Sequence, residues 1–193
     1  MNAGGLVIVG VGGTGVLKAG EIVSNFLFRK GYDVRQSEVH GMAQRGGSVI
    51  TQLRYGEKVY SPLLGRGDAQ YMVATEEIEA LRYADYLSPS AIVILNAWRL
   101  NPVGMKPELY TGRSASVLGK AGFQVYEIDA SSIACSLKNS QVMNTALVGA
   151  LSKLFFDCDE QLWEETIKEI FPTKLFEINM KAFIEGRNAI KGK

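Results

Sequence analysis

The first thirty or so residues constrain the fold of this chain more than any other stretch. Residues 6–9, Leu-Val-Ile-Val, form a short apolar run typical of a central parallel strand that is buried on both faces. The glycine-rich segment 10–15 follows directly, and from Val16 onward apolar residues recur at helical spacing. Gly31 ends this helix, and residues 32–36 read as the next strand. This strand–turn–helix–strand order is typical of the first half of a nucleotide-binding fold.

The remaining chain continues this alternation with one interruption. Residues 49–61 are expected to form a β-hairpin that turns at residues 55–58, and the pattern weakens between residues 96 and 122. A buried strand is predicted at 69–74 and further strands at 91–95 and 123–128. Helices are predicted at about 75–87, from 140, from 157 to 170, and after Pro172. We therefore expect an α/β protein. Its Rossmann-like, doubly wound sheet is mostly parallel, with a β-hairpin excursion and C-terminal helices, in one domain spanning residues 1–193.

Composition and charge exclude several classes of protein. Lys and Arg total 21 against 20 for Asp and Glu, so no general attraction to nucleic acid or to an anionic membrane is expected. The sequence has no run of about 18 apolar residues and no signal-like start, which predicts no membrane span. Cys135 and Cys158 form no CxxC pair, so a cytoplasmic, thiol-reduced protein is expected, and two cysteines cannot hold an iron–sulfur cluster.

The glycine-rich turn after the first strand is the first candidate site. Its pattern is Gly10-x-Gly12-Gly13-x-Gly15, with Thr14 as the last intervening residue. Glycines allow a sharp turn into the helix, whose free N–H groups and positive dipole end can hold a phosphate. The alternative is a tight turn that binds no ligand. The motif alone does not choose among NAD, FAD, ATP and coenzyme A.

A second candidate site lies in residues 37–49, where Gly41, Gly46 and Gly47 interrupt any helical or strand period. We interpret this segment as a loop whose backbone approaches a ligand and whose Arg45 meets an anion. The only histidine, His40, fits either a structural role or general acid–base work. Because ligands of doubly wound sheets bind outside the carboxyl ends of the strands, both glycine loops are expected to face one crevice.

Three further polar residues are candidates for contacts near this crevice. Glu38 lies about 28 residues after Gly10 and could hold the ribose of NAD, although the Arg45 loop suits anionic oxygens better. Asn144 lies on the apolar face of a strong helix, and its amide is expected to bond a loop backbone near the crevice. Asn96 follows a predicted strand and is a possible polar contact for a ligand.

The two glycine loops resemble those of the 2-oxoacid:ferredoxin oxidoreductases, in the small chain that corresponds to their gamma domain. The most specific stretch is His-Gly-Met-Ala-Gln-Arg-Gly-Gly at residues 40–47, which is most similar to the beta subunits of the indolepyruvate branch. Residues 55–62, 79–83 and 144–150 also resemble that branch. Thr14 departs from the pattern, because glutamine is expected there, and a side-chain contact at that position would differ.

This resemblance implies a subunit of a complex that oxidatively decarboxylates a 2-oxoacid, such as an arylpyruvate, to an acyl-CoA. The chain lacks cluster cysteines and a recognisable thiamine diphosphate signature, so thiamine diphosphate and the iron–sulfur clusters are expected on a larger partner subunit. The chain would assemble as a homodimer or heterotetramer, and ferredoxin would receive electrons from the whole complex. This chain alone would not be catalytic. Its expected contribution is active-site closure and a coenzyme A crevice formed by Gly10, Gly12, Gly13, Thr14, Gly15, Arg45, Gly46, Gly47 and Asn144.

Two alternatives from other classes remain open at this point. The chain could be a free-standing NAD- or flavin-binding Rossmann oxidoreductase that uses Glu38 for the ribose. It could also be an assembly module whose glycine loops only pack.

Overall fold

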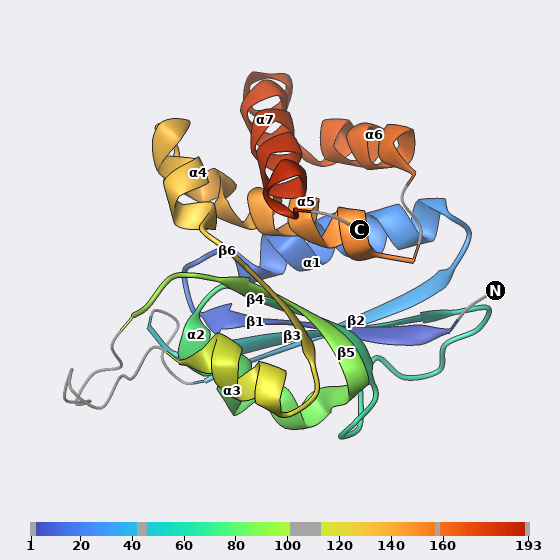
Figure 1. The fold of residues 1–193 in the computed structure, drawn as a ribbon. Coiled ribbons are helices and arrows are strands. Elements are labelled where there is room, and N and C mark those ends of the chain that lie inside the picture. The colour runs from blue at the N-terminus through green and yellow to red at the C-terminus, as the bar shows by residue number, and fades with distance from the viewer. Residues whose placement is uncertain (1–2, 42–45, 101–112, 157–158, 192–193) are drawn as a thin grey trace.

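A computed structural model describes residues 3–41, 46–100, 113–156 and 159–191. Six strands form one mixed sheet in the order β2-β3-β1-β4-β5-β6, with helices on both faces (Figure 1). Among the described strands, β3 alone runs opposite to the others. The strands are β1 (Gly4–Val11), β2 (Asp33–His40), β3 (Ser48–Gly56), β4 (Ala69–Ala74), β5 (Leu87–Asn96) and β6 (Gln124–Ile128).

The helices form two layers of unequal size. One face of the sheet carries α1, α4, α5, α6 and α7, and the other carries α2 and α3 (Figure 1). None of the helices in the described ranges combines the length and the apolarity needed to cross a bilayer. Their bounds are α1 (Val16–Arg29), α2 (Glu77–Arg82), α3 (Ser114–Lys120), α4 (Ala130–Ser136), α5 (Met143–Leu154), α6 (Glu160–Ile170) and α7 (Thr173–Ala189), with 3-10 turns at Ala84–Tyr86 and Ser140–Val142.

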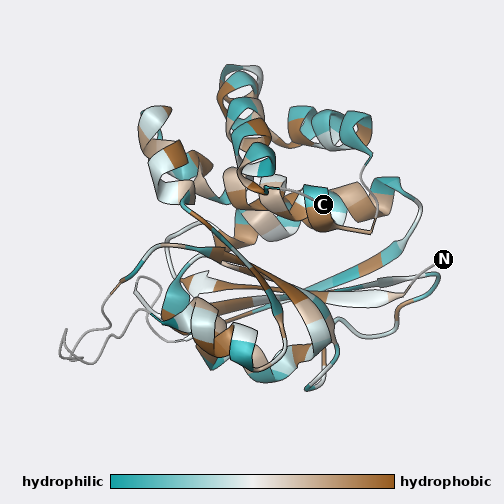
Figure 2. Ribbon diagram, viewed as in Figure 1, coloured by the Kyte–Doolittle hydropathy of each residue, from teal (hydrophilic) through white to brown (hydrophobic). Residues whose placement is uncertain are grey.

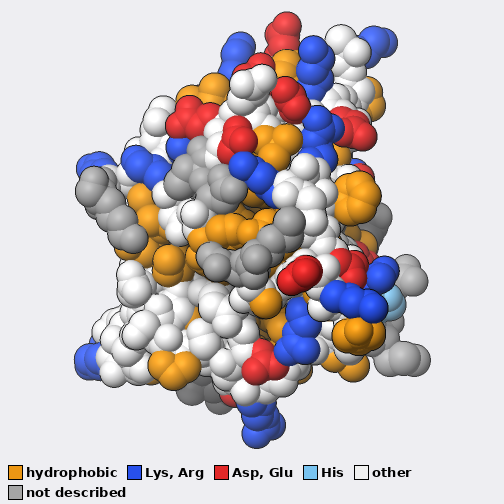
Figure 3. Space-filling view, turned by 90° about the vertical axis from the view of Figure 1, so that its right-hand side faces the viewer, with side chains coloured by type: hydrophobic (Ala, Val, Ile, Leu, Met, Phe, Trp, Pro, Cys, Tyr) orange, Lys and Arg blue, Asp and Glu red, His pale blue; other side chains and the backbone are white. Residues whose placement is uncertain are grey.

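Two hydrophobic clusters hold the layers to the sheet, and the hydropathy colouring places hydrophobic residues in the middle strands (Figure 2). On the side of α1, the rings of Phe26 and Trp163 stack with centroids 3.7 Å apart, and both residues are fully buried. At the amino-terminal end of β1, Tyr55 packs against Phe156 at 5.4 Å. Figure 3 shows hydrophobic side chains gathered on this side of the molecule, between the helical layer and the sheet.

Helices α5 and α7 pack backbone to backbone. A Cβ atom added to Gly149 would lie 2.0 Å from the carbonyl oxygen of Phe183, and one added to Gly186 would lie 1.9 Å from that of Ala146. No side chain fits at such distances, so glycine at these two positions sets how closely the helices approach.

The α/β class and the mostly parallel sheet are confirmed, but the predicted hairpin is wrong. β3 continues to Gly56 and pairs antiparallel with both β1 and β2, whereas residues 59–61 form no strand. Instead, the N–H of Val59 donates to Oδ2 of Asp33 at 2.9 Å, which draws this segment across the end of β2. The antiparallel pair of neighbouring strands that does form is β2 and β3, which follow each other in the sequence with the second glycine segment between them.

Several element boundaries also differ from those expected. The strand predicted to end at residue 36 continues to His40, because residues 37–40 pair with β3, so the first third of the expected loop is strand. The helix expected from about residue 75 is capped by Glu76, whose Oε2 accepts from the N–H groups of Ile78 and Glu79. That helix ends at Arg82 rather than near residue 87, where β5 already begins.

Helix α4 offers a test of how a cap depends on pH. The Asp129 carboxylate accepts from the hydroxyl of Ser132 at 2.6 Å and from its N–H at 2.8 Å, and these bonds lower the pKa of Asp129 below its ordinary value. A carboxyl group whose pKa is lower in the folded than in the unfolded state stabilises the fold at pH values above its unfolded-state pKa, about 4. This contribution is lost as the pH falls through the lower pKa of the folded state. We therefore expect Asp129→Ala to reduce the unfolding free energy by about 1 kcal/mol at neutral pH and by progressively less below pH ~4.

Urea denaturation at several pH values measures this difference. Asp129→Asn is the matched control, because an amide keeps the cap without a titrating group. An equal loss for the alanine variant at all pH values would contradict the assignment.

Candidate functional site

The two glycine segments meet at the carboxyl edge of the sheet. β1 ends at Val11 and β2 at His40, both at that edge, and β3 starts there. The N–H of Gly12 donates to the carbonyl of Gly47 at 2.7 Å, and the N–H of Gly46 donates to the carbonyl of Gly12 at 3.1 Å. The expected convergence of the two loops is thus observed, as a direct backbone contact. These two N–H groups are consequently already bonded, and the donors available to a ligand lie further along the first turn.

Those donors belong to Gly13 and Gly15, whose N–H groups bond no acceptor within the described ranges. Both residues are exposed and have positive φ, at 92° and 83°, which favours glycine strongly. Gly15 is also the N-cap of α1, a 14-residue helix whose positive dipole end points at this turn. Free N–H groups at a helix start form a ready-made anion site.

Gly10 and Thr14 stabilise the turn through contacts within the protein. Gly10 is buried in β1, where an added Cβ would lie 1.9 Å from Oγ1 of Thr75, so its glycine is required by this packing. The Thr14 hydroxyl donates to the carbonyl of Val11 at 2.7 Å and lies 3.2 Å from Oγ1 of Thr75. Both residues thereby fix the shape of the turn through internal contacts.

Asn144 reaches the same turn from α5. Its Nδ2 donates to the carbonyl of Thr14, and a Cβ added to Gly15 would lie only 2.5 Å from that nitrogen. The expected bond from this amide to a loop backbone is therefore present. Asn144 is only 4% exposed, and its Oδ1 is buried with no hydrogen-bond partner in the described part of the chain. The amide thus ties the turn to the helical layer.

Ser48, directly after the two glycines of the second loop, faces away from the first turn. Its hydroxyl donates to the Glu79 carboxylate and lies 2.9 Å from the hydroxyl of Tyr83, both close to α2. Glu79 is 5% exposed and also accepts from Nε of Arg82 at 3.1 Å. This anchor holds the start of β3 against α2. Sequence reasoning missed it, because only the fold brings residues 48 and 79 together.

Two pockets flank the first glycine turn. The outer pocket, of about 510 Å³, lies against the start of α1 and has largely apolar walls. The inner pocket, of about 580 Å³, lies between the turn and the helical layer. Gly13, Gly15 and Lys18 line both. The outer pocket is walled further by Val11, Val16, Leu17, His40 and Val49, and the inner one by Ser140, Gln141, Phe171, Pro172 and Leu175.

Charged groups near the turn are few in the described ranges. Nζ of Lys18 lies 2.5 Å from the Glu21 carboxylate in an exposed ion pair. His40 is exposed at the end of β2, and its Nδ1 lies 3.4 Å from the carbonyl of Gly41. Arg45, the cation predicted to meet an anion, lies outside the described residues, so its role stays a prediction from sequence.

The structure does not support a ligand contact for Asn96. The residue is fully buried, its Nδ2 donates to the carbonyl of Thr75 at 3.1 Å, and its Oδ1 accepts from the N–H of Ala130 at 3.1 Å. Its amide joins the ends of β4 and β5 to α4, so the possible ligand contact expected for Asn96 is replaced by internal hydrogen bonds.

Glu38 is poorly placed to hold a ribose beside the first turn. β3 lies between β1 and β2, so the carboxyl ends of these two strands are about two strand spacings, roughly 10 Å, apart. In addition, the Glu38 carboxylate accepts from Nε2 of Gln36 at 2.8 Å on the outer edge of the sheet. This arrangement weakens the NAD alternative.

Comparison with known proteins agrees with this architecture. The family model for pyruvate ferredoxin/flavodoxin oxidoreductase matches residues 5–189. The chain is 38% identical to indolepyruvate oxidoreductase subunit IorB of Thermococcus kodakarensis, over 96% of this chain and 95% of that protein. It superimposes on the gamma subunit of a keto/oxoacid ferredoxin oxidoreductase from Geobacter sulfurreducens PCA, with a TM-score of 0.72 and 17% identity, covering 96% of this chain and 97% of the other.

A larger solved structure contains the same fold as one part. It is 2-oxoglutarate:ferredoxin oxidoreductase from Magnetococcus marinus with 2-oxoglutarate, coenzyme A and succinyl-CoA bound. The superposition has a TM-score of 0.75 and 20% identity, and covers 98% of this chain and 31% of that one.

The fold and the paired glycine turns thus define a gamma-type subunit fold of the oxoacid oxidoreductases. The chain belongs to the pyruvate ferredoxin/flavodoxin oxidoreductase family. Among its curated relatives at 31–38% identity, the shared name is indolepyruvate oxidoreductase subunit IorB.

Proposed function

We propose that this chain is the small subunit of a 2-oxoacid:ferredoxin oxidoreductase that converts arylpyruvates, such as indolepyruvate, to acyl-CoA. Its own contribution is the crevice that receives coenzyme A, with residues 1–193 acting as one cytoplasmic domain. The single observation that carries the proposal is the pair of N–H groups on Gly13 and Gly15, which bond no acceptor among the described residues and lie at the start of α1 between two pockets. Relatives named as subunits of such oxidoreductases support it.

Coenzyme A combines the groups that this crevice suits. Its diphosphate can accept hydrogen bonds from the N–H groups of Gly13 and Gly15, and the positive end of the α1 dipole would stabilise its negative charge. Its pantetheine arm is extended, and the gem-dimethyl and methylene groups between its amides suit the walls formed by Val16, Leu17 and Val49. The mixed inner pocket, with Gln141 and Phe171, can take a base or further polar groups. Two pockets on either side of one anion site fit a ligand with a charged middle.

The residues of this chain bind and orient, and the chemistry belongs to the assembled complex. Thiamine diphosphate and iron–sulfur clusters, held by the larger subunit, would supply the decarboxylation chemistry and the path of the electrons to ferredoxin. Asn144 and Thr14 fix the turn, the bonds between Gly12 and Gly46–Gly47 hold the second segment against it, and the apolar walls exclude water from the arm. Arg45, from its sequence position, would add a cation for a phosphate oxygen.

Activity measured with and without the partner tests this proposal. The chain co-expressed with the thiamine-binding subunit should reduce ferredoxin when indolepyruvate and coenzyme A are both present, and the isolated chain should show no turnover. Omission of coenzyme A should stop steady-state turnover. A complex that reduces ferredoxin equally well without coenzyme A would contradict the assigned role, and one that ignores arylpyruvates would overturn the substrate class.

A further inference from the structure

Lys18 is a cation beside the first glycine turn whose place in the helix is unusual. It lies in the first turn of α1, and it lines both the outer and the inner pocket. Among the described residues that line these two pockets, it is the only Lys or Arg. The first turn of α1 holds no acidic residue, so this cation faces the positive end of the helix dipole, which is unfavourable. An anion bound at the turn would reverse that effect.

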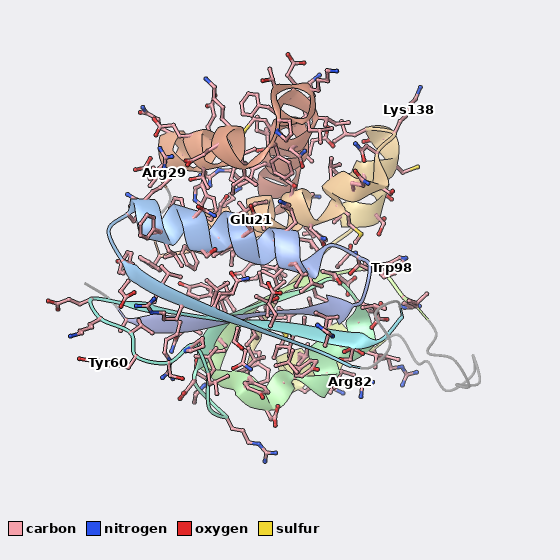
Figure 4. The ribbon with its side chains drawn as sticks, turned by 180° about the vertical axis from the view of Figure 1, so that it is seen from behind. Glu21, Arg29, Tyr60, Arg82, Trp98 and Lys138 are labelled. Carbon is pink, nitrogen blue, oxygen red and sulfur yellow. The ribbon has the colours of Figure 1, made fainter. Side chains whose placement is uncertain are left out.

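Two contacts place the Lys18 ammonium group at the boundary between the pockets. Its Nζ lies 2.5 Å from the carboxylate of Glu21, which lines the outer pocket and is labelled on α1 in Figure 4. The same Nζ lies 5.8 Å from the centre of the Phe171 ring, which is a wall of the inner pocket. The ammonium group therefore lies beside the inner pocket, with a carboxylate on its other side.

The ion pair with Glu21 leaves Lys18 able to bind a second anion. Both side chains are 45% exposed, and an ion pair in water is weak and easily rearranged. An ammonium group also has three N–H donors, and one is enough for the carboxylate of Glu21. A phosphate oxygen in the inner pocket can therefore accept from Nζ whether or not Glu21 keeps its contact.

Asn144 is a second polar group at the turn whose hydrogen bonding is incomplete. It is 4% exposed, and its Nδ2 donates to the carbonyl of Thr14, but its buried Oδ1 has no hydrogen-bond partner within the described ranges. A buried acceptor without a donor is unfavourable, and a hydroxyl group is a donor that could satisfy it. The turn thus offers N–H donors, a cation and an acceptor. A ribose phosphate presents the complementary groups, because it carries both phosphate oxygens and a hydroxyl.

We propose that Lys18 binds the 3′-phosphate of coenzyme A and thereby selects coenzyme A over its 3′-dephospho form. This inference rests on the proposed function, in which the diphosphate accepts from the N–H groups of Gly13 and Gly15 and the base enters the inner pocket. The ribose joins the diphosphate to the base and carries the 3′-phosphate. Lys18 lies between the turn and the Phe171 wall of the inner pocket, so its ammonium group is next to the ribose. A charge-assisted hydrogen bond then joins Nζ to the phosphate.

Binding of coenzyme A and of 3′-dephospho-coenzyme A tests the proposal. Isothermal titration calorimetry on the complex with the larger subunit, without a 2-oxoacid, gives a Kd for each ligand. The wild type should bind coenzyme A about tenfold more tightly than the dephospho form, as expected for one added hydrogen bond between charged groups. Lys18→Met should weaken the binding of coenzyme A alone, so that the two Kd values become nearly equal. The wild-type preference should also fall as salt is added, because the charges are exposed.

Two further variants separate a contact of Lys18 from a general effect of charge. Lys138→Met removes the same charge from an exposed position after α4, outside the linings of both pockets, where the side chain extends away from the helical layer (Figure 4). It should leave the preference for coenzyme A at the wild-type value. Glu21→Gln should strengthen the preference, because it removes a carboxylate that competes with the phosphate for Nζ of Lys18. A weaker preference in Glu21→Gln would overturn the proposal.

Gly13→Ala, measured in the same way, distinguishes failure of this inference from failure of the proposed function. If it weakens both ligands while Lys18→Met leaves the wild-type preference intact, the turn binds coenzyme A and the role of Lys18 is overturned. An equal loss for both ligands in Lys18→Met also overturns that role, because it would place Lys18 at the diphosphate. If neither Gly13→Ala nor Lys18→Met changes either Kd, the turn is not the coenzyme A site, and the proposed function and this inference fail together.

Discussion

Gly13→Ala is expected to raise the KM for coenzyme A about 10- to 100-fold in the reconstituted complex. Gly13 has φ of 92°, and its N–H at the start of α1 bonds no acceptor in the described part of the chain, so an added methyl group obstructs the approach of a phosphate oxygen to the backbone. A hydrogen bond to a charged group is worth about 1.5–3 kcal/mol, and each 1.4 kcal/mol corresponds to a factor of about ten. Steady-state ferredoxin reduction at varied coenzyme A concentration measures this change.

The matched control is Gly122→Ala. Gly122 has a similar φ of 96°, no atom within 4 Å of an added Cβ, and a place just before β6, at the opposite edge of the sheet. Both variants therefore carry the same kind of backbone strain, about 1 kcal/mol in each fold. The control should lose stability without a change in KM. Equal KM values for the two variants would remove the first turn from the coenzyme A site.

Gly149→Ala is expected to lower the unfolding free energy by roughly 3 kcal/mol. The added Cβ would lie 2.0 Å from the carbonyl oxygen of Phe183, so α5 and α7 must separate over a closely packed crossing. This cost exceeds the helix-propensity gain of about 1 kcal/mol that alanine brings over glycine. Since about 1 kcal/mol moves the Tm of a chain this size by roughly 2–4 °C, a thermal melt should shift down by roughly 10 °C.

Gly119→Ala provides the control with the opposite sign. Gly119 lies in α3, is exposed, and has no atom within 4 Å of an added Cβ. Only the propensity gain applies there, so the Tm should stay or rise slightly. A Gly149→Ala variant that is as stable as Gly119→Ala would contradict the backbone-to-backbone packing of α5 and α7.

The elements at the start of the chain were predictable because local signals there agree with the fold. The apolar strand, the glycine turn and the amphipathic α1 form one unit, and its direction places both glycine segments at one sheet edge. The family resemblance, carried by residues 40–47, is likewise confirmed by the relatives that cover nearly the whole chain.

The features that the sequence predicted wrongly depend on hydrogen-bond partners that are distant in the sequence. The stretch 37–40 has no clear strand pattern, yet it is strand because β3 supplies its hydrogen-bond partners. A turn at residues 55–58 predicts Val59 in a hairpin strand, whereas its N–H donates to the carboxylate of Asp33 in the structure. Asn96 looked free because its partners, Thr75 and Ala130, are distant in sequence.

In the candidate site too, some features were predictable from the sequence and others depend on the fold. The positions of the glycines followed from the sequence, but which N–H groups stay free did not, because the bonds between Gly12, Gly46 and Gly47 depend on contact between two loops. Asn144 was identifiable as a polar residue on an apolar helix face, and its bond to Thr14 explains why it is there.

The most direct test of the central claim is the position of coenzyme A in a structure of the complex with the larger subunit. We predict diphosphate oxygens at hydrogen-bonding distance, about 2.7–3.2 Å, from the backbone nitrogens of Gly13 and Gly15. A coenzyme A molecule whose diphosphate lies away from this turn, with both N–H groups facing water or protein, would contradict it.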